Sequence, residues 1–176
     1  MRTFPTHIGA GLLLATTSSL ALAQSPSATA IPVTVDNYNR AESDVYLGLN
    51  VKTGGFGTFL HTREPVPVDN QGAIRPNRDT LYSAAVFDPD ASPVTVTLPD
   101  AGNRFMSTQV INEDQYTPGV YYRAGSHTLP KEAIGTRYVN VVGRTLVDPA
   151  NPQDVRQVHA SSQQYIQQRN QEKAYE

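Results

Sequence analysis

The sequence predicts one mainly β domain, an antiparallel β-sandwich with a helix before its strands and a helix after them. Four or five short segments rich in strand-forming residues follow one another between residues 80 and 147. Turn residues, not helices, join these segments, which is typical of antiparallel strands in a sandwich or barrel. Removal of a predicted 23-residue leader from the 176 residues leaves 153, which is enough for one domain.

The leader is predicted from the first residues. Met1 and Arg2 give a positive start, residues 8–22 are mostly apolar, and Ala21-Leu22-Ala23 is a small-x-small cleavage site. The apolar stretch is too short and too polar to cross a bilayer core of about 30 Å. We therefore expect residues 1–23 to be a signal peptide. Residues 24–35 contain small polar side chains and two prolines, and we expect a disordered lead-in there.

A first helix is predicted after Asp36, which suits the N-cap position. Apolar residues then recur at spacings of three and four, which places them on one helix face, and Gly54-Gly55 ends the helix. The predicted apolar face consists of Tyr38, Ala41, Val45 and Leu49. The segment "FGTFLHTREPVPVDNQG", residues 56–72, lacks periodicity and predicts a long loop.

From Thr80 onward, the spacing of apolar residues changes to one that predicts strands. Within "VTVTL", Val94, Val96 and Leu98 alternate with threonine, which predicts a strand with these three side chains facing inward. Residues 99–104, "PDAGNR", have the turn chemistry of a hairpin loop, and the turn-rich residues 124–135 are expected to join two strands. The predicted strand segments are "TLYSAAVF" (80–87), "VTVTL" (94–98), "FMSTQVI" (105–111), "GVYYR" (119–123) and "RYVNVVGRTLV" (137–147).

A last helix is predicted from "DPANPQD". Asn151 can cap it, Pro152 suits its first turn, and Asp154 complements the positive end of the helix dipole. Its predicted apolar face consists of Val155, Val158, Ser162, Tyr165 and Ile166. The β-sandwich domain with its flanking helices is thus expected to span residues 36–168, followed by a polar tail at 169–176.

The charge balance argues against a nucleic-acid partner. Without Arg2, the chain keeps 13 Lys and Arg against 16 Asp and Glu, a net charge of −3, and it has no basic run. The cations are mostly arginine, the residue suited to planar, bidentate contacts with carboxylates. The chain has no cysteine, which excludes disulfides and thiol catalysis.

Three segments carry a resemblance to a known family. They are "IRPNRDTLYSAAVFD", "VTVTLPDAGNRFMSTQVINEDQYTPGVYY" and "GTRYVNVVGRTLVDPANPQDVRQVHA". Together they resemble the family catalogued as domain of unknown function 1254, over most of residues 39–160. The resemblance implies an immunoglobulin-like β-sandwich with helices at both ends, usually exported in bacteria. It supplies no catalytic residue.

The same resemblance implies a second β domain, of unknown function family 1214, after the first. This sequence ends at Glu176, near where that domain would begin. The expectation is therefore either a short stand-alone member of the family or a truncated one.

The segment "IRPNRDTLYS", residues 74–83, is dense in polar side chains and allows two interpretations. In the structural one, Asp79 caps the turn and pairs with an arginine, and Asn77 satisfies loop backbone groups. In the other, Arg75 and Arg78 clamp a carboxylate or phosphate. Pro76 favours an extended Arg75. We expect the structural role to dominate, with the Asp79 carboxylate as its hub.

A second polar cluster is "INEDQYTPGVYYR". Its adjacent acids, Glu113 and Asp114, diverge in an extended segment and make a poor acid–base pair. Its tyrosines could wall a pocket, because each offers a ring and a hydroxyl group. The predicted ligand-facing residues of both clusters are Arg75, Arg78, Asp79, Tyr82, Tyr116 and Tyr122.

The sequence assigns no catalytic residue. The histidines show no metal-ligand spacing, so no metal and no cofactor is expected, and the G-x-S-x-G motif of hydrolases is absent. His61, near Arg63 and Glu64, is the best single candidate for acid–base chemistry.

The leading functional prediction is a periplasmic or secreted module of unknown biochemical function that binds a small ligand or assists another protein. Its expected partners are a small anionic or polar ligand and either a second β domain or a second copy bound through the C-terminal helix. No nucleic acid and no membrane span after signal cleavage are expected. The alternatives are a hydrolase-type enzyme whose site needs a second β domain, and a truncated remnant without independent activity.

Overall fold

The computed structural model describes residues 30–69, 71, 75–164 and 166–169. The predicted signal peptide, half of the predicted lead-in and most of the polar tail lie outside these residues. The chain divides into two compact units, residues 1–32 and 33–176, and the helices and strands of the described residues belong to the second. These elements are α1 (Tyr38–Lys52), β1 (Leu60–His61), β2 (Thr80–Phe87), β3 (Val94–Leu98), β4 (Met106–Asn112), β5 (Gly119–Tyr121), β6 (Gly125–Leu129), α2 (Lys131–Ile134), β7 (Val139–Leu146), α3 (Pro152–Ser162) and β8 (Ile166–Arg169).

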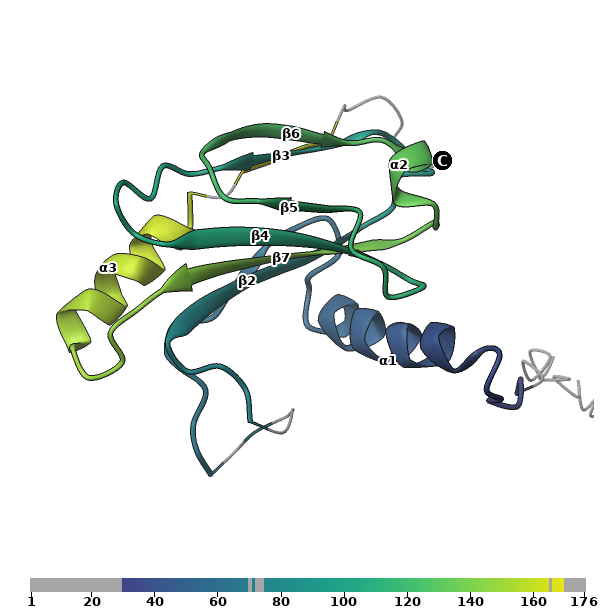
Figure 1. Cartoon of the computed structure of the whole chain (residues 1–176), viewed down its shortest axis with the longest axis horizontal. Coiled ribbons are helices and arrows are strands. Elements are labelled where there is room, and N and C mark those ends of the chain that lie inside the picture. Colours follow the sequence, from purple (N-terminus) through teal and green to yellow (C-terminus); the bar gives the residue numbers. More distant parts are fainter. Residues whose placement is uncertain (1–29, 70, 72–74, 165, 170–176) are drawn as a thin grey trace, which may run out of the picture. The chain divides into compact units, whose positions relative to one another are not determined.

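The strands form two antiparallel sheets, which confirms the predicted mainly β fold. The larger sheet has the order β1-β2-β7-β4-β5, and the smaller has the order β6-β3-β8 (Figure 1). One isolated parallel bridge, between Phe56 and Val86, adds to the edge of the larger sheet. The predicted long loop at 56–72 therefore contributes a bridge and the short strand β1.

The core lies between the two sheets. Val94, Val96 and Leu98 of β3 are each 2% exposed, as their alternation with threonine predicts. They pack against residues of the larger sheet that include Ala85, Phe87 and Val141, all fully buried. This alternation fixes an inner face of the larger sheet, toward the smaller sheet, and an outer face on the opposite side.

Two predictions about connections are wrong. Residues 99–104 do not close a hairpin, because β3 pairs with β6 and β8 whereas β4 pairs with β5 and β7. Residues 124–135 are not only turns, because they contain β6 and α2. The strand β6 has few strand-forming residues, but its side chains reach β3 through hydrogen bonds of 2.8 Å (Thr97 to Ser126) and 3.1 Å (Thr95 to Thr128).

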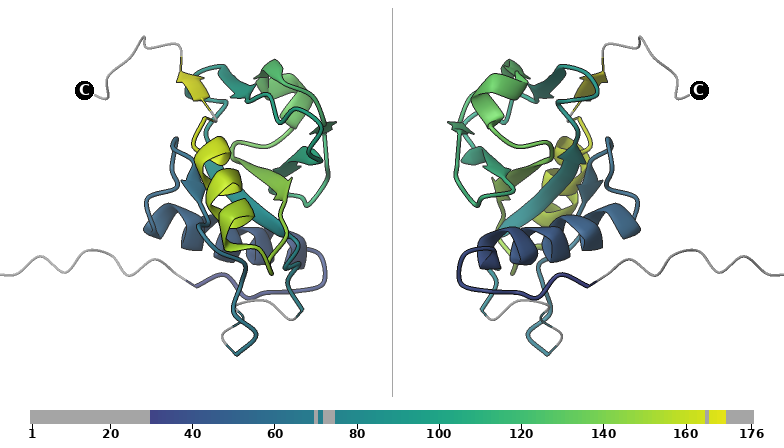
Figure 2. Two further views of the ribbon diagram at one scale, coloured as in Figure 1. Left: turned by 90° about the vertical axis from the view of Figure 1, so that its left-hand side faces the viewer. Right: turned by 90° about the vertical axis from the view of Figure 1, so that its right-hand side faces the viewer.

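The last helix folds back on the sandwich. Val158 is fully buried and packs in a cluster with Leu81 and Val147, at the end of the sandwich where β2 begins and β7 ends (Figure 2). The Asn151 side chain accepts hydrogen bonds from the main-chain nitrogens of Gln153 and Asp154, which confirms the predicted cap.

The predicted end of the last helix is wrong. The helix stops at Ser162, and Ile166 lies in β8, where it pairs with Thr97. Tyr165, also assigned to the helix face, lies outside the described residues. Pairing with β3 is a tertiary interaction, which helical periodicity does not register.

The first helix also differs from its prediction. Asn37, not Asp36, holds the N-cap position. The helix lies on the outer side of the larger sheet (Figures 1 and 2) and buries Ser43 and Leu47. On the predicted apolar face, Tyr38, Val45 and Leu49 are 54%, 58% and 55% exposed, so that face points to solvent and not into the core.

A buried and an exposed phenylalanine together test which residues form the core. Phe87 is fully buried and meets Phe59 edge to face at 5.8 Å between ring centroids, whereas Phe105 is half exposed on the outer face. Phe87→Ala should lower the free energy of unfolding by about 3–5 kcal/mol, because it opens a cavity. Phe105→Ala should lower it by less than about 1 kcal/mol. Denaturant unfolding of both variants tests this, and equal losses would contradict the assigned core.

Candidate functional site

In the described structure, α1 covers the outer face of the larger sheet near the end of β2 (Figure 1). Toward the start of β2, cross-strand register places Tyr82 opposite Arg144 and Arg144 opposite Ser107. Thr62 continues this row, because its main-chain nitrogen donates to the Tyr82 carbonyl oxygen at 2.8 Å. Side chains of three strands therefore meet in one row across the sheet.

Arg144 is the central side chain of this row. Its guanidinium lies over the Tyr82 ring, 5.7 Å from the ring centroid, a distance at which a cation is attracted to an aromatic face. No acidic side chain in the described part of the chain pairs with Arg144, although five other basic–acidic contacts occur there. Arg144 is thus a cation held in place by an aromatic ring, with its charge uncompensated.

The outer face also holds most of the buried polar atoms that lack a partner. Among the described residues four side-chain atoms are buried without a hydrogen bond, and three of them belong to Thr80, Asn140 and Arg144. In Arg144 the atom is Nε. All three residues lie at alternating strand positions whose side chains point to the outer face. A buried polar group without a hydrogen-bond partner costs free energy. In the described structure, this cost falls mainly on the outer face.

Exposed apolar side chains lie beside this row, and we call them the apolar border: Phe105, Val120, Tyr122 and Leu146. The rings of Phe105 and Tyr122 lie 6.2 Å apart, and the Phe105 carbonyl oxygen accepts from the Leu146 nitrogen at 3.0 Å. Their exposed fractions range from 41% to 61%. A free cation next to an exposed apolar border can hold a ligand that carries both a negative group and an apolar body.

Two of the six predicted ligand-facing residues therefore lie on the outer face. Tyr82 stands beneath Arg144, and Tyr122 belongs to the apolar border. They come from segments forty residues apart in the sequence, and the sheet order brings their strands into one layer.

Three more predicted residues, Arg75, Arg78 and Asp79, lie in the segment that leads into β2. The described part of this connection extends on the same side of the larger sheet as α1 (Figures 1 and 2). Arg78 Nε donates to the Val66 carbonyl oxygen at 2.8 Å. Arg75 has a φ of 56°, so its expected extended conformation is wrong, and its main-chain nitrogen donates to the Gln71 side chain at 3.3 Å.

The structural interpretation of "RPNRD" holds for Asn77 but not for the Asp79 carboxylate. Asn77 Oδ1 accepts from the Asp79 nitrogen at 3.3 Å, and the Asp79 carbonyl oxygen accepts from the Val147 nitrogen at 2.8 Å. The exposed Asp79 carboxylate accepts no hydrogen bond from any described residue. The hub of this turn is therefore the Asn77 side chain and the main chain of Asp79.

Tyr116, the sixth predicted residue, lies at the opposite end of the sheet. It is 72% exposed in the turn after β4, and its nitrogen donates to the Asn112 side chain at 2.9 Å. In the same turn Glu113 and Asp114 converge on Arg40 of α1, and Asp114, more than Glu113, raises the Arg40 pKa. The buried Glu113 also accepts from the Tyr138 nitrogen at 2.8 Å, so this acid pair anchors α1.

His61 contacts a serine, but the pair does not form a hydrolytic site. His61 Nδ1 lies 2.8 Å from Ser83 Oγ, and burial, with a smaller effect of His159, lowers the His61 pKa. Ser83 is only 2% exposed on the inner face. A nucleophile has to reach its substrate, so this contact serves to satisfy the buried Ser83 hydroxyl group with the half-buried His61 imidazole.

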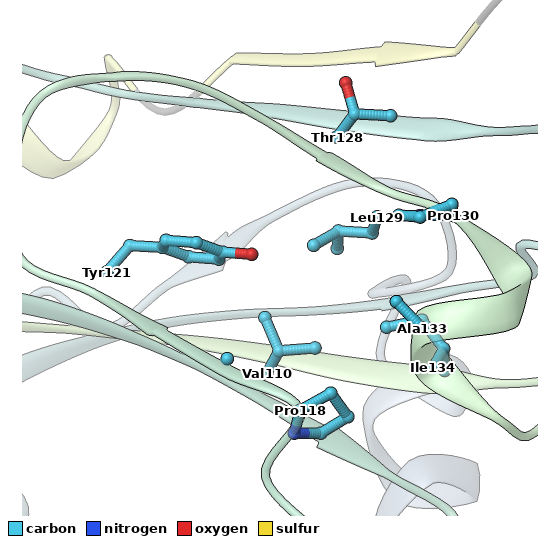
Figure 3. A pocket seen from close by; sticks show the side chains of 9 residues that line it. Val110, Pro118, Tyr121, Thr128, Leu129, Pro130, Ala133 and Ile134 are labelled. Atoms are coloured by element: carbon cyan, nitrogen blue, oxygen red, sulfur yellow. The ribbon is translucent and has the colours of Figure 1, made fainter.

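A small pocket opens between the two sheets, near α2 (Figure 3). Apolar side chains of Val110, Pro118, Leu129, Ala133 and Ile134 form much of its lining, and the Tyr121 hydroxyl group points into it (Figure 3). It offers no charged group to orient a ligand. Within the described residues no group of three or more His, Cys, Asp or Glu side chains could hold a metal ion, and no helix is long and apolar enough to cross a membrane.

Arg144 was missed by reasoning from the sequence. The segment "VNVVGRTL" alternates, so its strand period already placed residue 144 on the outward side. The pairing of β7 with both β2 and β4 was not predictable from that period, and it is this pairing that puts Arg144 in the middle of the sheet and over Tyr82.

Comparison with known proteins supports the family but not a reaction. Residues 56–129 match the family model described as Protein of unknown function (DUF1254), so the resemblance found in the sequence is confirmed over this segment. No curated protein matches the chain.

A solved structure has a similar fold. It is the crystal structure of the VPA0106 protein from Vibrio parahaemolyticus, with a TM-score of 0.54 and 17% sequence identity. The match covers 76% of this chain and 36% of that protein, so this chain corresponds to about a third of it.

In the turn before β2, we expect the Asn77 side chain to contribute more to stability than the Asp79 carboxylate. Asn77→Ala should lower the free energy of unfolding by about 0.5–1.5 kcal/mol, because it removes the acceptor of the Asp79 nitrogen. Asp79→Asn should change it by no more than about 0.5 kcal/mol, since the carboxylate is exposed. Denaturant melts of the two variants decide the order. A larger loss for Asp79→Asn would restore the carboxylate as the hub.

Proposed function

We propose that this chain is an exported module that binds a small carboxylate on the outer face of the larger sheet, around Arg144. The observation that carries the proposal is the Arg144 guanidinium, which lies over the Tyr82 ring without an acidic partner in the described structure. A cation that no described side chain neutralises, on the part of the outer face that α1 leaves uncovered, suits an anionic ligand.

The surroundings of Arg144 favour a carboxylate with an apolar body. A guanidinium group can donate two parallel hydrogen bonds to one carboxylate, which orients the ligand as well as binding it. The apolar border then gains from burial of the rest of the ligand, at about 25 cal/mol for each Å² of apolar surface removed from water. Arg75 and Arg78, on the connection that extends from the same side, add positive charge near the approach to this face.

Export to the periplasm or the medium is part of the proposal. It rests on the positive start, the apolar stretch and the Ala21-Leu22-Ala23 site of residues 1–23. A module that binds a small molecule outside the cytoplasm can act alone or assist a larger assembly. A further β domain would fit the match to about a third of the VPA0106 protein. The α3 helix is a weaker place for a partner, because Val158 already packs on Leu81 and Val147.

Ligand-dependent stabilisation tests the site. The full chain is melted with acetate, benzoate, succinate or inorganic phosphate, and benzoate is expected to stabilise it most. At about 100 times its dissociation constant, a ligand that binds only the native state adds about 2.7 kcal/mol. Arg144→Gln should abolish this gain. Without ligand it should lower the stability by no more than about 1 kcal/mol, because it loses the contact with the Tyr82 ring but no hydrogen bond at Nε.

Arg156→Gln is the matched control. Arg156 is exposed on α3, away from the outer face, so this variant should keep the full benzoate response. A response that survives in Arg144→Gln, or that vanishes equally in both variants, would refute the site. So would a parent chain that none of the four probes stabilises.

Export is tested separately, by the mass of the mature protein. The chain is expressed in a bacterium with an outer membrane, and the periplasmic fraction is recovered by osmotic shock. Mass spectrometry should find a chain that begins at Gln24, because signal peptidase cuts after a small-x-small site. An intact Met1 in the cytoplasmic or membrane fraction would contradict export.

A further inference from the structure

The exposed apolar side chains of this protein are concentrated near its N-terminal helix. Fifteen large apolar residues are exposed in the described structure. Seven of them lie between residues 33 and 51, and five of these seven lie on α1 itself. Isolated exposed apolar residues are normal, but a contiguous group marks an interaction surface. The group on α1 is therefore the strongest candidate for a docking surface.

The more polar side of α1 faces the larger sheet. The side chains that anchor it are the buried Ser43 and Leu47 and the ion-paired Arg40. On the opposite side, Tyr38, Ala41, Val45 and Leu49 follow one another at spacings of three, four and four, and we call them the apolar stripe. Three of the four are more than half exposed. An amphipathic helix normally turns its apolar side toward the core of the domain. Because α1 turns this side outward, we infer that the apolar stripe contacts a partner outside this fold.

We propose that a second copy of this chain covers the apolar stripe, through an antiparallel pairing of the two α1 helices about a two-fold axis at Val45. Val45 is the central residue of α1, which runs from Tyr38 to Lys52. An axis at this point therefore lays the whole of one helix along the whole of the other, over about 22 Å. The same surface then serves both copies, as a two-fold interface requires.

The side chains of the stripe are self-complementary in this arrangement. Ala41 of one helix faces Leu49 of the other, so a small side chain meets a large one on each side of the axis. Gly48 has nothing within 4 Å of the position its side chain would take, which leaves room for the opposing helix. Large side chains opposite small ones let two helices pack closely.

The charges select the antiparallel direction. Lys52 ends the helix, and Asp36 stands just before its start. Antiparallel pairing brings Lys52 of each copy to the Tyr38 ring and the Asp36 carboxylate of the other. It also places the positive end of each helix dipole beside the negative end of the other. Parallel pairing would place the two lysines side by side. Because one helix pair is smaller than a standard interface of about 1,600 Å², the dimer should form reversibly at micromolar concentrations.

Charge substitution at the axis tests the proposal. Sedimentation velocity of the full chain over a range of micromolar concentrations should show a monomer–dimer equilibrium. Val45→Glu places two carboxylates face to face at the axis and should weaken dimerisation by at least about tenfold. Val51→Glu is the matched control, because Val51 is exposed on the same helix but lies off the apolar stripe, and it should leave the equilibrium unchanged.

A mixture gives the decisive measurement. Val45→Glu and Val45→Lys should each be monomeric alone and should form a heterodimer when mixed, which no merely destabilising effect of the substitutions would produce. A parent chain that is monomeric throughout, or a dimer that Val45→Glu leaves intact, would overturn the proposal. A monomer whose apolar stripe instead binds vesicles of phosphatidylcholine and phosphatidylglycerol would overturn it in favour of a lipid surface.

Discussion

The register among β2, β7 and β4 decides which side chains of this protein meet. The core between the sheets needs Ala85, Phe87 and Val141 on the inner face, and a shift of one residue would turn each of them outward. Because side chains alternate, the same register places Tyr82 and Arg144 opposite each other on the outer face. The proposed binding face is thus a consequence of core packing, and its geometry is as rigid as the central strands.

The outer face and the inner face carry different kinds of polar group. On the inner face Ser83 is buried but meets His61, and in the turn after β4 the buried Glu113 accepts a hydrogen bond from the Tyr138 nitrogen. On the outer face, Arg144 Nε and Asn140 Oδ1 lack such partners within the described structure. Three of the four buried polar atoms without a partner in the described structure lie on this one face, an arrangement that suits a ligand or a partner there.

The two proposals concern different parts of the same side of the larger sheet. Arg144 lies toward the start of β2, and α1 covers the end where β2 finishes (Figure 1). Arg40 and the acid pair Glu113 and Asp114 hold α1 in place without using its apolar stripe. A dimer through that stripe would leave the Arg144 row open, so ligand binding and self-association can be tested independently.

The sequence by itself determined the class of fold, most of the strands and the cap of the last helix. These features depend on local patterns: the alternation in "VTVTL" buries one side of a strand, and Asn151 binds main-chain groups two and three residues ahead of it. The same local patterns correctly grouped Tyr38, Ala41, Val45 and Leu49 on one helix face. They could not show whether that face points into the core or away from it.

Only the tertiary structure decided that direction, the strand order and the composition of the candidate site. The orientation of α1 is set by an ion pair between Arg40 and Asp114, which are 74 residues apart. The isolation of β3 from β4, and the position of Arg144 over Tyr82, follow from the order of the strands in two sheets. These are contacts between distant segments, and their free energy depends on which surfaces meet, which no periodicity within a single segment records.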